Sequence, residues 1–239
     1  MADDKVKPIK MITPRVTFIW PKLNEPDYGN EKFPKPDGEF SVKARCKADD
    51  PAVVEMLNKL QPLLDAAIAK GKVEFSKLKV DQRKKLKDIT VNPLFSTVYD
   101  QETEEATGDI EFKFAMAHSG TIKKGPKAGK KWERSPALFD AKGKPMKAAI
   151  WSGTIGKVSF TVNPEGYFIP GTGAVGLKLG LEAVQVIQLA NGRDRNADSY
   201  GFGTEEDGYS EDDAPQGGFS DESGDAGDSS DDDQGNGDF

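Results

Sequence analysis

The chain has 239 residues, of which 36% are hydrophobic, and its formal net charge is −7 at pH 7. Its one cysteine and one histidine exclude an internal disulfide and leave little for a zinc site or for a nucleophile that histidine activates. No run approaches 18 apolar residues and the N-terminus lacks an apolar signal core, so we expect a soluble cytosolic protein without a membrane span.

A β-strand is the first element that the pattern predicts. Residues 15–20 alternate between apolar and polar side chains, as in a half-buried strand, and we expect Pro21 to end it. The predicted apolar face holds Val16, Phe18 and Trp20. Residues 24–38 contain Pro, Gly, Asn and Asp throughout and therefore predict a long loop.

A second strand, residues 39–47, separates an apolar face from a basic one. The residues expected to face inward are Phe40, Val42, Ala44 and Cys46. The alternate positions include Lys43 and Arg45, which we expect to point outward. This strand therefore predicts a core on one side and a positively charged surface on the other.

A helix is expected from Pro51 onward, because Asp50 suits the capping position and proline suits the first helical position. Apolar residues at helical spacing follow: Val53, Leu57, Leu60, Leu64, Ala67 and Ile68. Pro62 lies inside this pattern and is expected to kink or split the helix, and Gly71 is expected to stop it. The basic segment 75–89 favours a further helix.

The remainder of the body has strand patterns. The expected strands are residues 94–99, 110–117, 147–162 and 174–190. The third is expected to bend at Gly153 and Gly156, and the alternation of the fourth slips near Glu182 and Ala183, which indicates a bulge. Five or more strands, one long helical insertion and bends marked by glycine favour a small closed barrel.

Two patterns resemble catalytic or cofactor motifs. Residues 171–176 match GxGxxG, but a strand pattern rather than a helix follows, so we interpret them as a turn. The carboxylates Asp49 and Asp50 are better explained as helix caps than as ligands of a metal nuclease, which must converge from separate elements. His118 at the end of a strand is interpreted as a surface residue. The sequence predicts no catalytic residue, no metal site and no cofactor.

Aromatic residues are interleaved with basic ones on the predicted strands. A period of two places Lys130, Trp132 and Arg134 on one side, which predicts a stacking platform between two cations. The other candidate cations are Lys43, Arg45, Lys113, Lys157 and Lys178, and the other candidate rings are Trp20, Tyr28, Phe33, Trp151 and Tyr167. Non-specific binding of a single strand needs this combination, because cations follow the phosphates and rings stack on bases.

The C-terminal residues 198–239 form an acidic tail. These 42 residues hold 15 of the 40 acidic residues and no Lys or Arg, so their formal charge is −15 against +8 for residues 1–197. Such a segment cannot bury enough apolar surface to offset its ordering entropy, and we expect it to be disordered. An acidic arm on a basic body indicates that the body binds a polyanion. The arm can then occupy the same binding surface in place of that polyanion. A tail that only increases solubility is the alternative.

Several segments resemble the single-stranded-DNA-binding replication proteins of short-tailed bacteriophages. They are residues 25–30, 110–117, 137–146, 152–162 and 173–190, together with the terminus Gly237-Asp238-Phe239. The resemblance implies a mainly β OB-fold, a five-stranded Greek-key barrel, with an inserted helix in residues 1–197. It also implies binding of single-stranded DNA in phage replication, recombination and repair, within the bacterial host cytoplasm and without catalysis.

The resemblance further implies that the tail recruits partners, namely the phage DNA polymerase and helicase-primase. The residues implied in this contact are Asp231, Asp232, Asp233, Asp238 and Phe239. The sequence leaves open whether the chain forms a homodimer. It also leaves open an acidic-tailed RNA-binding protein or nucleic-acid chaperone, because the contact that distinguishes RNA from DNA, at the 2′-hydroxyl, is a local detail.

Overall fold

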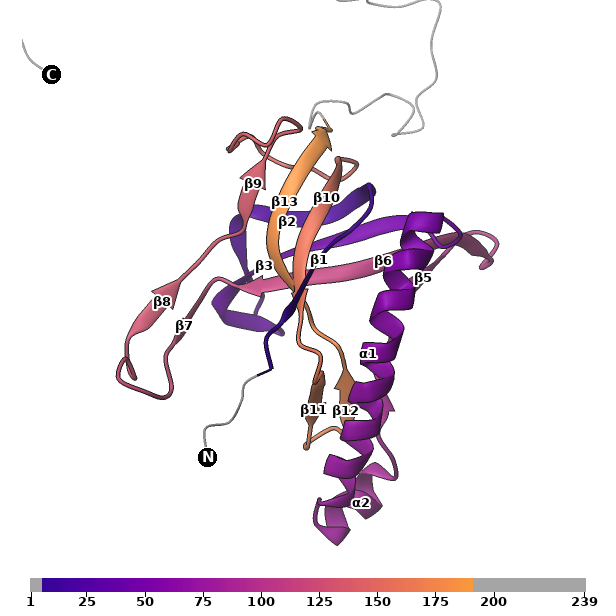
Figure 1. Ribbon diagram of the computed structural model, residues 1–239, viewed down its shortest axis with the longest axis vertical. Helices are drawn as coiled ribbons and strands as arrows, with labels where there is room; N and C mark the ends of the chain where they lie inside the picture. Colours follow the sequence, from indigo (N-terminus) through magenta and orange to yellow (C-terminus); the bar gives the residue numbers. More distant parts are fainter. Residues whose placement is uncertain (1–5, 191–239) are drawn as a thin grey trace, which may run out of the picture. The chain divides into compact units, whose positions relative to one another are not determined.

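The computed structural model describes residues 6–190, which form a mainly β body with two helices (Figure 1). The strands are β1 (Ile9–Ile12), β2 (Val16–Gly29), β3 (Pro34–Lys47), β4 (Thr90–Val91), β5 (Ser96–Tyr99), β6 (Ala106–Ala117), β7 (Ser119–Thr121), β8 (Lys131–Glu133), β9 (Ala137–Phe139), β10 (Ile155–Val162), β11 (Tyr167–Ile169), β12 (Ala174–Gly176) and β13 (Leu179–Gln188). The helices are α1 (Pro51–Ser76) and α2 (Val80–Leu86). The predicted acidic tail and its partner-binding residues lie outside the described residues.

Five strands close a barrel. Hydrogen-bonded neighbours run in the order β10, β2, β3, β6 and β13, and β13 pairs back onto β10. The pairs are antiparallel except for the single parallel pairing of β6 with β13. The closed barrel predicted from the strand patterns is therefore confirmed.

The barrel core consists mainly of aromatic and branched side chains. Phe18, Phe112, Phe114 and Phe160 are fully buried, and the ring centroids of the last two lie 4.8 Å apart. The predicted inward face of residues 39–47 is buried except for Cys46, which is half-buried. Burial raises the pKa of its thiol to about 11, so it is an uncharged packing residue at neutral pH.

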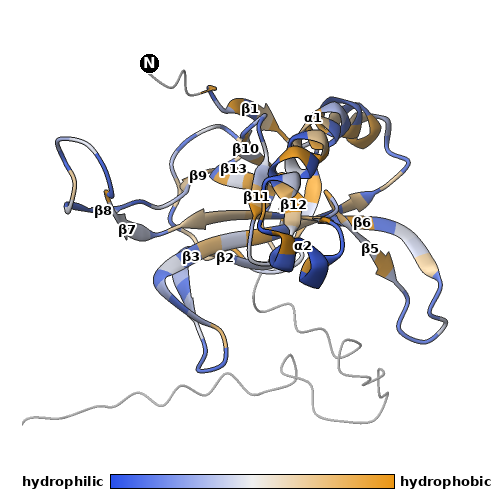
Figure 2. Cartoon of the chain, turned by 90° about the horizontal axis from the view of Figure 1, so that it is seen from below, coloured by the Kyte–Doolittle hydropathy of each residue, from blue (hydrophilic) through white to orange (hydrophobic). Residues whose placement is uncertain are grey.

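Two small sheets extend from the barrel. β7 and β8 form a hairpin, and β11, β12 and β4 form a three-stranded sheet that packs against α1. Figure 1 shows the hairpin projecting to the lower left and β11–β12 running downward beside α1. The connection between β7 and β8 is largely hydrophilic along its length (Figure 2). Both extensions therefore enlarge the surface around one end of the barrel.

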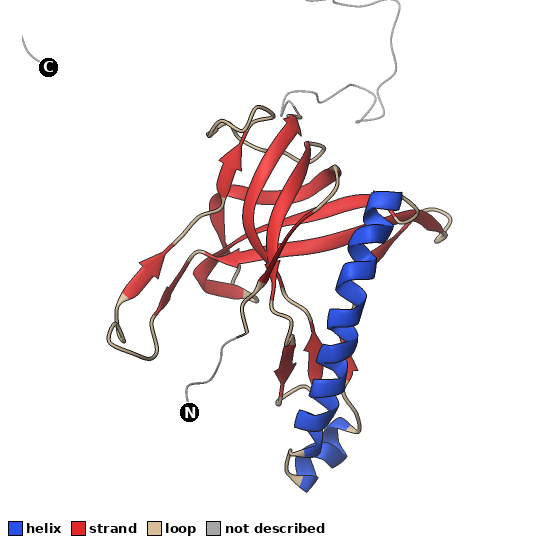
Figure 3. Cartoon of the chain, in the orientation of Figure 1, coloured by secondary structure: helices blue, strands red, loops and turns tan. Residues whose placement is uncertain are grey.

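Helix α1 is longer than the sequence predicts and is unbroken (Figure 3). Its start is confirmed, because the Asp50 side chain accepts a hydrogen bond of 2.8 Å from the Ala52 N–H. The predicted split at Pro62 and the predicted stop at Gly71 are wrong, because the helix continues through both residues to Ser76. Pro62 is exposed, so water can hydrate the carbonyl that loses its partner.

Gly71 allows α1 to approach β12 closely. A Cβ atom there would lie 2.7 Å from a side-chain carbon of Val175. Glycine costs about 1 kcal/mol relative to alanine inside a helix, and this close packing offsets that cost. The basic segment after α1 does form a helix, α2, but none of its residues is buried. Within residues 6–190, neither helix is long and apolar enough to cross a membrane.

A long hairpin of β2 and β3 replaces the predicted loop at residues 24–38. β2 continues through Pro21, and its ladder with β3 is interrupted by several register shifts. These interruptions tolerate prolines and glycines that an even ladder would exclude. The Lys35 ammonium group joins the two strands, since it lies 2.8 Å from both the Asp27 and the Glu39 carboxylates.

The last two predicted strands also differ from the structure. β10 begins at Ile155, because residues 147–154 form a connection that the Asn24 side chain holds through the Ala148 carbonyl and the Ile150 N–H. Residues 174–190 form two strands, β12 and β13, instead of one. The bulge expected near Glu182 is confirmed by the register shift between β10 and β13. Residues 171–176 lie in and after a turn that leads into β12, as interpreted.

Candidate nucleic-acid interface

The outward face of β3 and β6 carries predicted cations together with a carboxylate. Glu111 of β6 lies 3.0 Å from the Lys43 ammonium group and 2.6 Å from the Arg45 guanidinium group. Burial acts to raise the pKa of Glu111, but hydrogen bonds from Arg45 and Lys43 outweigh it and hold the pKa below its ordinary value. Glu111 therefore neutralises part of the charge that the sequence assigns to phosphate binding.

A depression of about 440 Å³ lies beside this face, where β3, β6, β11 and the start of β13 meet. It brings together Lys113, Lys178 and Tyr167, three of the predicted site residues, from separate parts of the chain. The rest of its lining is Glu39, Ala115, Ile169, Leu177 and Leu179. The Tyr167 hydroxyl is held by a 2.6 Å hydrogen bond from the Asn92 amide. Two cations and one fixed ring therefore surround a mainly apolar hollow.

The β7–β8 hairpin holds the predicted Trp132 platform, but its geometry differs from a ring between two cations. The Arg134 guanidinium carbon lies over the Trp132 ring, 5.0 Å from the ring centroid. The Arg134 Nε donates a hydrogen bond of 3.0 Å to the Ala117 carbonyl. Trp132 is opposite Gly120, where a Cβ atom would lie 2.7 Å from the ring. Lys130 precedes β8 and is exposed. The hairpin therefore presents a cation stacked on a half-buried ring.

Tyr28 lies at the same end of the barrel as this hairpin. A Cβ atom at Gly38 would lie 3.1 Å from the Tyr28 ring and 3.2 Å from His118. The His118 ring nitrogen Nδ1 lies 3.0 Å from the Arg134 carbonyl oxygen, so the one histidine joins the two hairpins. Tyr28 is 56% exposed, which leaves its ring accessible.

Trp20 points outward, so its predicted place on the inner face with Val16 and Phe18 is wrong. An extra residue in β2 between the positions opposite Lys43 and Ser41 forms a bulge at Trp20. Its φ of +48° is rare for a residue with a side chain, and the ring is 74% exposed.

Trp151 belongs to the same part of the surface as Trp20. The Trp20 N–H donates to the Ser152 hydroxyl at 2.9 Å, and the Gly153 N–H donates to the Phe18 carbonyl at 2.9 Å. The turn after Trp151 therefore holds the bulge in place. Trp151 is 54% exposed, so two accessible indole rings lie on hydrogen-bonded segments, β2 and the turn that contains Ser152.

Lys157 is separated from the other predicted cations. It lies on β10. In the barrel, β2 lies between β10 and β3, and β13 lies between β10 and β6. There it lines a groove of about 760 Å³ between β1 and α1, with Lys10 and Lys59. The structure thus places Lys43, Arg45, Lys113 and Lys178 around one end of the barrel and Lys157 elsewhere.

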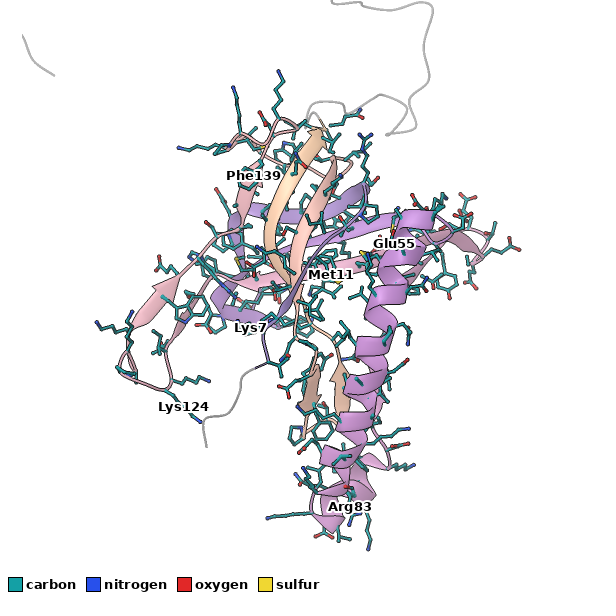
Figure 4. The ribbon with its side chains drawn as sticks, in the orientation of Figure 1. Lys7, Met11, Glu55, Arg83, Lys124 and Phe139 are labelled. Carbon is teal, nitrogen blue, oxygen red and sulfur yellow. The ribbon has the colours of Figure 1, made fainter. Side chains whose placement is uncertain are left out.

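Further cations of the β7–β8 connection were not singled out from the sequence. They are Lys123, Lys124 and Lys127, together with Lys131 at the start of β8. Figure 4 shows Lys124 at the tip of this connection, away from the barrel, and Arg83 on α2. The density of lysine in a glycine-rich loop is the signal that could have identified them. Within residues 6–190, no group of three or more His, Cys, Asp or Glu residues is placed to hold a metal ion.

A sequence model of a protein family described as the single-stranded DNA-binding protein of bacteriophage T7 matches residues 18–189. The fold is similar to the crystal structure of gp2.5, a single-stranded DNA-binding protein encoded by bacteriophage T7. The TM-score is 0.61 at 23% identity, over 82% of this chain and 98% of that chain. This similarity confirms the predicted OB-fold.

The single-stranded DNA-binding protein of bacteriophage Enc34 is more distant. Its complex with single-stranded DNA aligns with a TM-score of 0.45 at 11% identity, over 79% of this chain and 98% of that chain. A C-terminal truncation of the same protein aligns with a TM-score of 0.47 at 10% identity, over 76% and 87% of the two chains. No curated protein sequence matches the chain.

Proposed function

Because this chain belongs to the bacteriophage T7 single-stranded DNA-binding protein family, we propose that it coats single-stranded DNA without strong sequence preference during phage replication, recombination and repair. It does so in the cytoplasm of the bacterial host and catalyses no reaction. DNA, rather than RNA, is its physiological ligand.

The depression that unites Lys113, Lys178 and Tyr167 is the observation that carries this proposal. A single strand exposes both its phosphates and the faces of its bases, whereas a duplex hides the faces. Lysines at a rim can follow phosphates while an adjacent ring stacks on a base. Because every base has an aromatic face, such contacts have little dependence on sequence.

The other exposed rings extend this surface beyond the depression. Trp20 and Trp151 lie on one edge of the barrel and Tyr28 on the β2–β3 hairpin, all more than half exposed. Each stacked base contributes about 1–3 kcal/mol, so three or four such contacts suffice for useful affinity. On the β7–β8 hairpin, Arg134 is stacked on Trp132 and offers a planar cation to the DNA strand.

The acidic tail, residues 198–239, competes with DNA for this surface and recruits the phage DNA polymerase and helicase-primase. Its formal charge of −15 against +8 for residues 1–197 supports this role. When DNA occupies the surface, the tail is released to its partners. Asp231, Asp232, Asp233, Asp238 and Phe239 supply the charges and the ring for that contact.

Competition among three labelled nucleic acids of equal length tests the proposal. The full chain is titrated with single-stranded DNA, duplex DNA and RNA at two salt concentrations. We expect single-stranded DNA to bind most tightly and all affinities to fall with salt. Preference for RNA or for the duplex overturns the proposal, and cleavage of the strand in the presence of Mg²⁺ overturns the absence of catalysis.

A further inference from the structure

Glu39 is a carboxylate on the surface that is proposed to bind phosphates. It lies on β3 and lines the depression with Lys113, Lys178 and Tyr167. Its side chain is 26% exposed, so a ligand in the depression can reach it. An acid at this place repels the DNA backbone, and repulsion alone would make it a poor residue for a binding surface. Its presence therefore requires a separate explanation.

Among the described residues, only one of the two Glu39 carboxylate oxygens has a partner. Oε1 accepts a hydrogen bond from the Lys35 ammonium group at 2.8 Å and lies 3.9 Å from the Lys113 ammonium group. Within residues 6–190, Oε2 accepts no hydrogen bond. Hydrogen bonds to Asp27 and Glu39 raise the pKa of Lys35, so Lys35 stays charged and anchors the carboxylate. An anchored carboxylate with a vacant acceptor is suited to recognise a donor.

The depression suits a nucleobase in size and lining. Its volume of about 440 Å³ falls in the range of roughly 300–1,000 Å³ that is typical of small-molecule sites. Ile169, Leu177 and Leu179 supply apolar walls, and Tyr167 supplies a ring whose hydroxyl is tied to Asn92. A base that stacks there presents its hydrogen-bonding edge to the polar residues of the rim.

We propose that Glu39 makes this depression a base-discriminating subsite that prefers bases with an exocyclic amino group over thymine. This inference rests on the proposed binding of single-stranded DNA. A carboxylate accepts a hydrogen bond from the amino group of cytosine, as Glu and Asp do in duplex recognition. Thymine has no amino group, and its ring N–H lies between two carbonyl oxygens that a carboxylate repels. The surface therefore binds every sequence, with one position biased against thymine.

The test compares oligo-dC with oligo-dT, two pyrimidine strands of equal length. The quantity measured is the ratio of the two affinities for the full chain, with and without substitution of Glu39. A ratio is needed because the two strands differ in stacking and flexibility whatever protein binds them. We expect Glu39→Gln to shift the ratio toward oligo-dT by about 5-fold or more, since one charge-assisted contact to cytosine is lost.

Matched variants separate this effect from a change in charge. Glu39→Asp keeps the charge but shortens the side chain, and we expect it to shift the ratio in the same direction. Glu111→Gln also removes one negative charge from the same face of β3 and β6, but Glu111 does not line the depression. Asp27→Asn removes the negative charge of the other carboxylate that contacts Lys35. We expect both to change the two affinities in parallel and to leave the ratio unchanged.

Each outcome distinguishes the inference from the function on which it rests. A ratio unaffected by Glu39→Gln, in a variant that still binds both strands, overturns the subsite and leaves the proposed function intact. Equal shifts in Glu39→Gln, Glu111→Gln and Asp27→Asn, the three variants that remove a negative charge, assign the effect to charge and also overturn the subsite. Failure of the wild-type chain to bind either strand overturns the proposed function itself.

Discussion

Lys43 of β3 lies directly opposite Lys113 of β6 in the antiparallel ladder. Like charges at opposite positions of a ladder destabilise a sheet. Glu111 contacts Lys43 at 3.0 Å, but among residues 6–190 the carboxylate nearest to Lys113, on Glu39, is 3.9 Å away. A phosphate that binds between the two lysines relieves this repulsion, so we interpret the pair as a phosphate contact that folding alone does not favour.

The first prediction concerns the salt dependence of binding. Lys113→Gln should lower the slope of log affinity against log salt by about 0.7, the value for one phosphate contact on a single strand. Stability should stay the same or rise slightly, because the repulsion is removed. Lys47→Gln is the matched control, since Lys47 lies on the neighbouring strand β3 but pairs with Asp109 at 3.0 Å. An unchanged slope for Lys113→Gln excludes the contact.

The second prediction uses the backbone of Trp20. Both Trp20→Gly and Trp20→Ala remove the ring, and both should weaken single-strand binding by about 1–3 kcal/mol. They should differ in stability, because the positive φ of +48° costs alanine about 1–2 kcal/mol and costs glycine nothing. Urea unfolding and DNA titration of the two variants measure these effects. Wild-type affinity in both would show that the ring does not contact DNA.

Local patterns predict the barrel strands and the helix start because neighbouring residues determine them. Residues 39–47 and 110–117 alternate because one face is buried along their whole length. Asp50 caps α1 through a contact only two residues away. Gly71 is different, because its role depends on a contact with Val175, which is distant in the sequence. From the sequence alone, Gly71 is therefore interpreted as the end of the helix.

The candidate site depends even more on distant residues. A period of two correctly places Arg45 on the outer face, but the carboxylate that partly neutralises it is Glu111, 66 positions along the chain. The outward turn of Trp20 depends on Ser152, which is 132 positions away. The sequence can therefore suggest which cations and rings are exposed. Only the fold shows which of them are already paired, which share one depression, and that Lys157 lies apart.

The third prediction concerns the arginine–tryptophan stack of the β7–β8 hairpin. Trp132→Ala should weaken single-strand binding by about 1–3 kcal/mol, because Arg134 loses the ring that orients it. The melting temperature should change little, since the hairpin lies outside the barrel core. Tyr99→Ala is the control, because Tyr99 is 61% exposed on β5, a strand without candidate site residues. Unfolding of the Trp132 variant would place the ring in a core instead.

The fourth prediction concerns acid stability. The pKa of Glu111 is lowered in the folded state, so its contribution is fully present above the ordinary glutamate pKa of about 4.3 and is lost as pH falls toward the folded pKa. Glu111→Gln should therefore be less stable than wild type at pH 7, by about 1–2 kcal/mol. The difference should shrink below about pH 4.3. Urea unfolding at several pH values measures it, and a difference independent of pH would contradict this account.

The last prediction concerns the acidic tail, residues 198–239, as a competitor of DNA. An unstructured chain of 42 residues, which the composition predicts, has an end-to-end distance of roughly 35 Å. A body of 197 residues has a radius of gyration near 16 Å, so such a tail can reach any groove on it. The resulting effective concentration is on the order of millimolar, which is enough to populate a weak electrostatic contact that DNA must displace.

Deletion of residues 198–239 should therefore raise the affinity for single-stranded DNA, most strongly at low salt, because a competitor of charge −15 is removed and salt screens its attraction to the body. The same deletion should abolish recruitment of the polymerase and helicase-primase. Phe239→Ala separates the two roles: it removes one ring and no charge, so the partner contact should weaken while DNA affinity stays nearly unchanged. If the truncated chain binds DNA no more tightly than the full chain at low salt, the tail does not occupy the DNA surface and acts only on solubility or on partners.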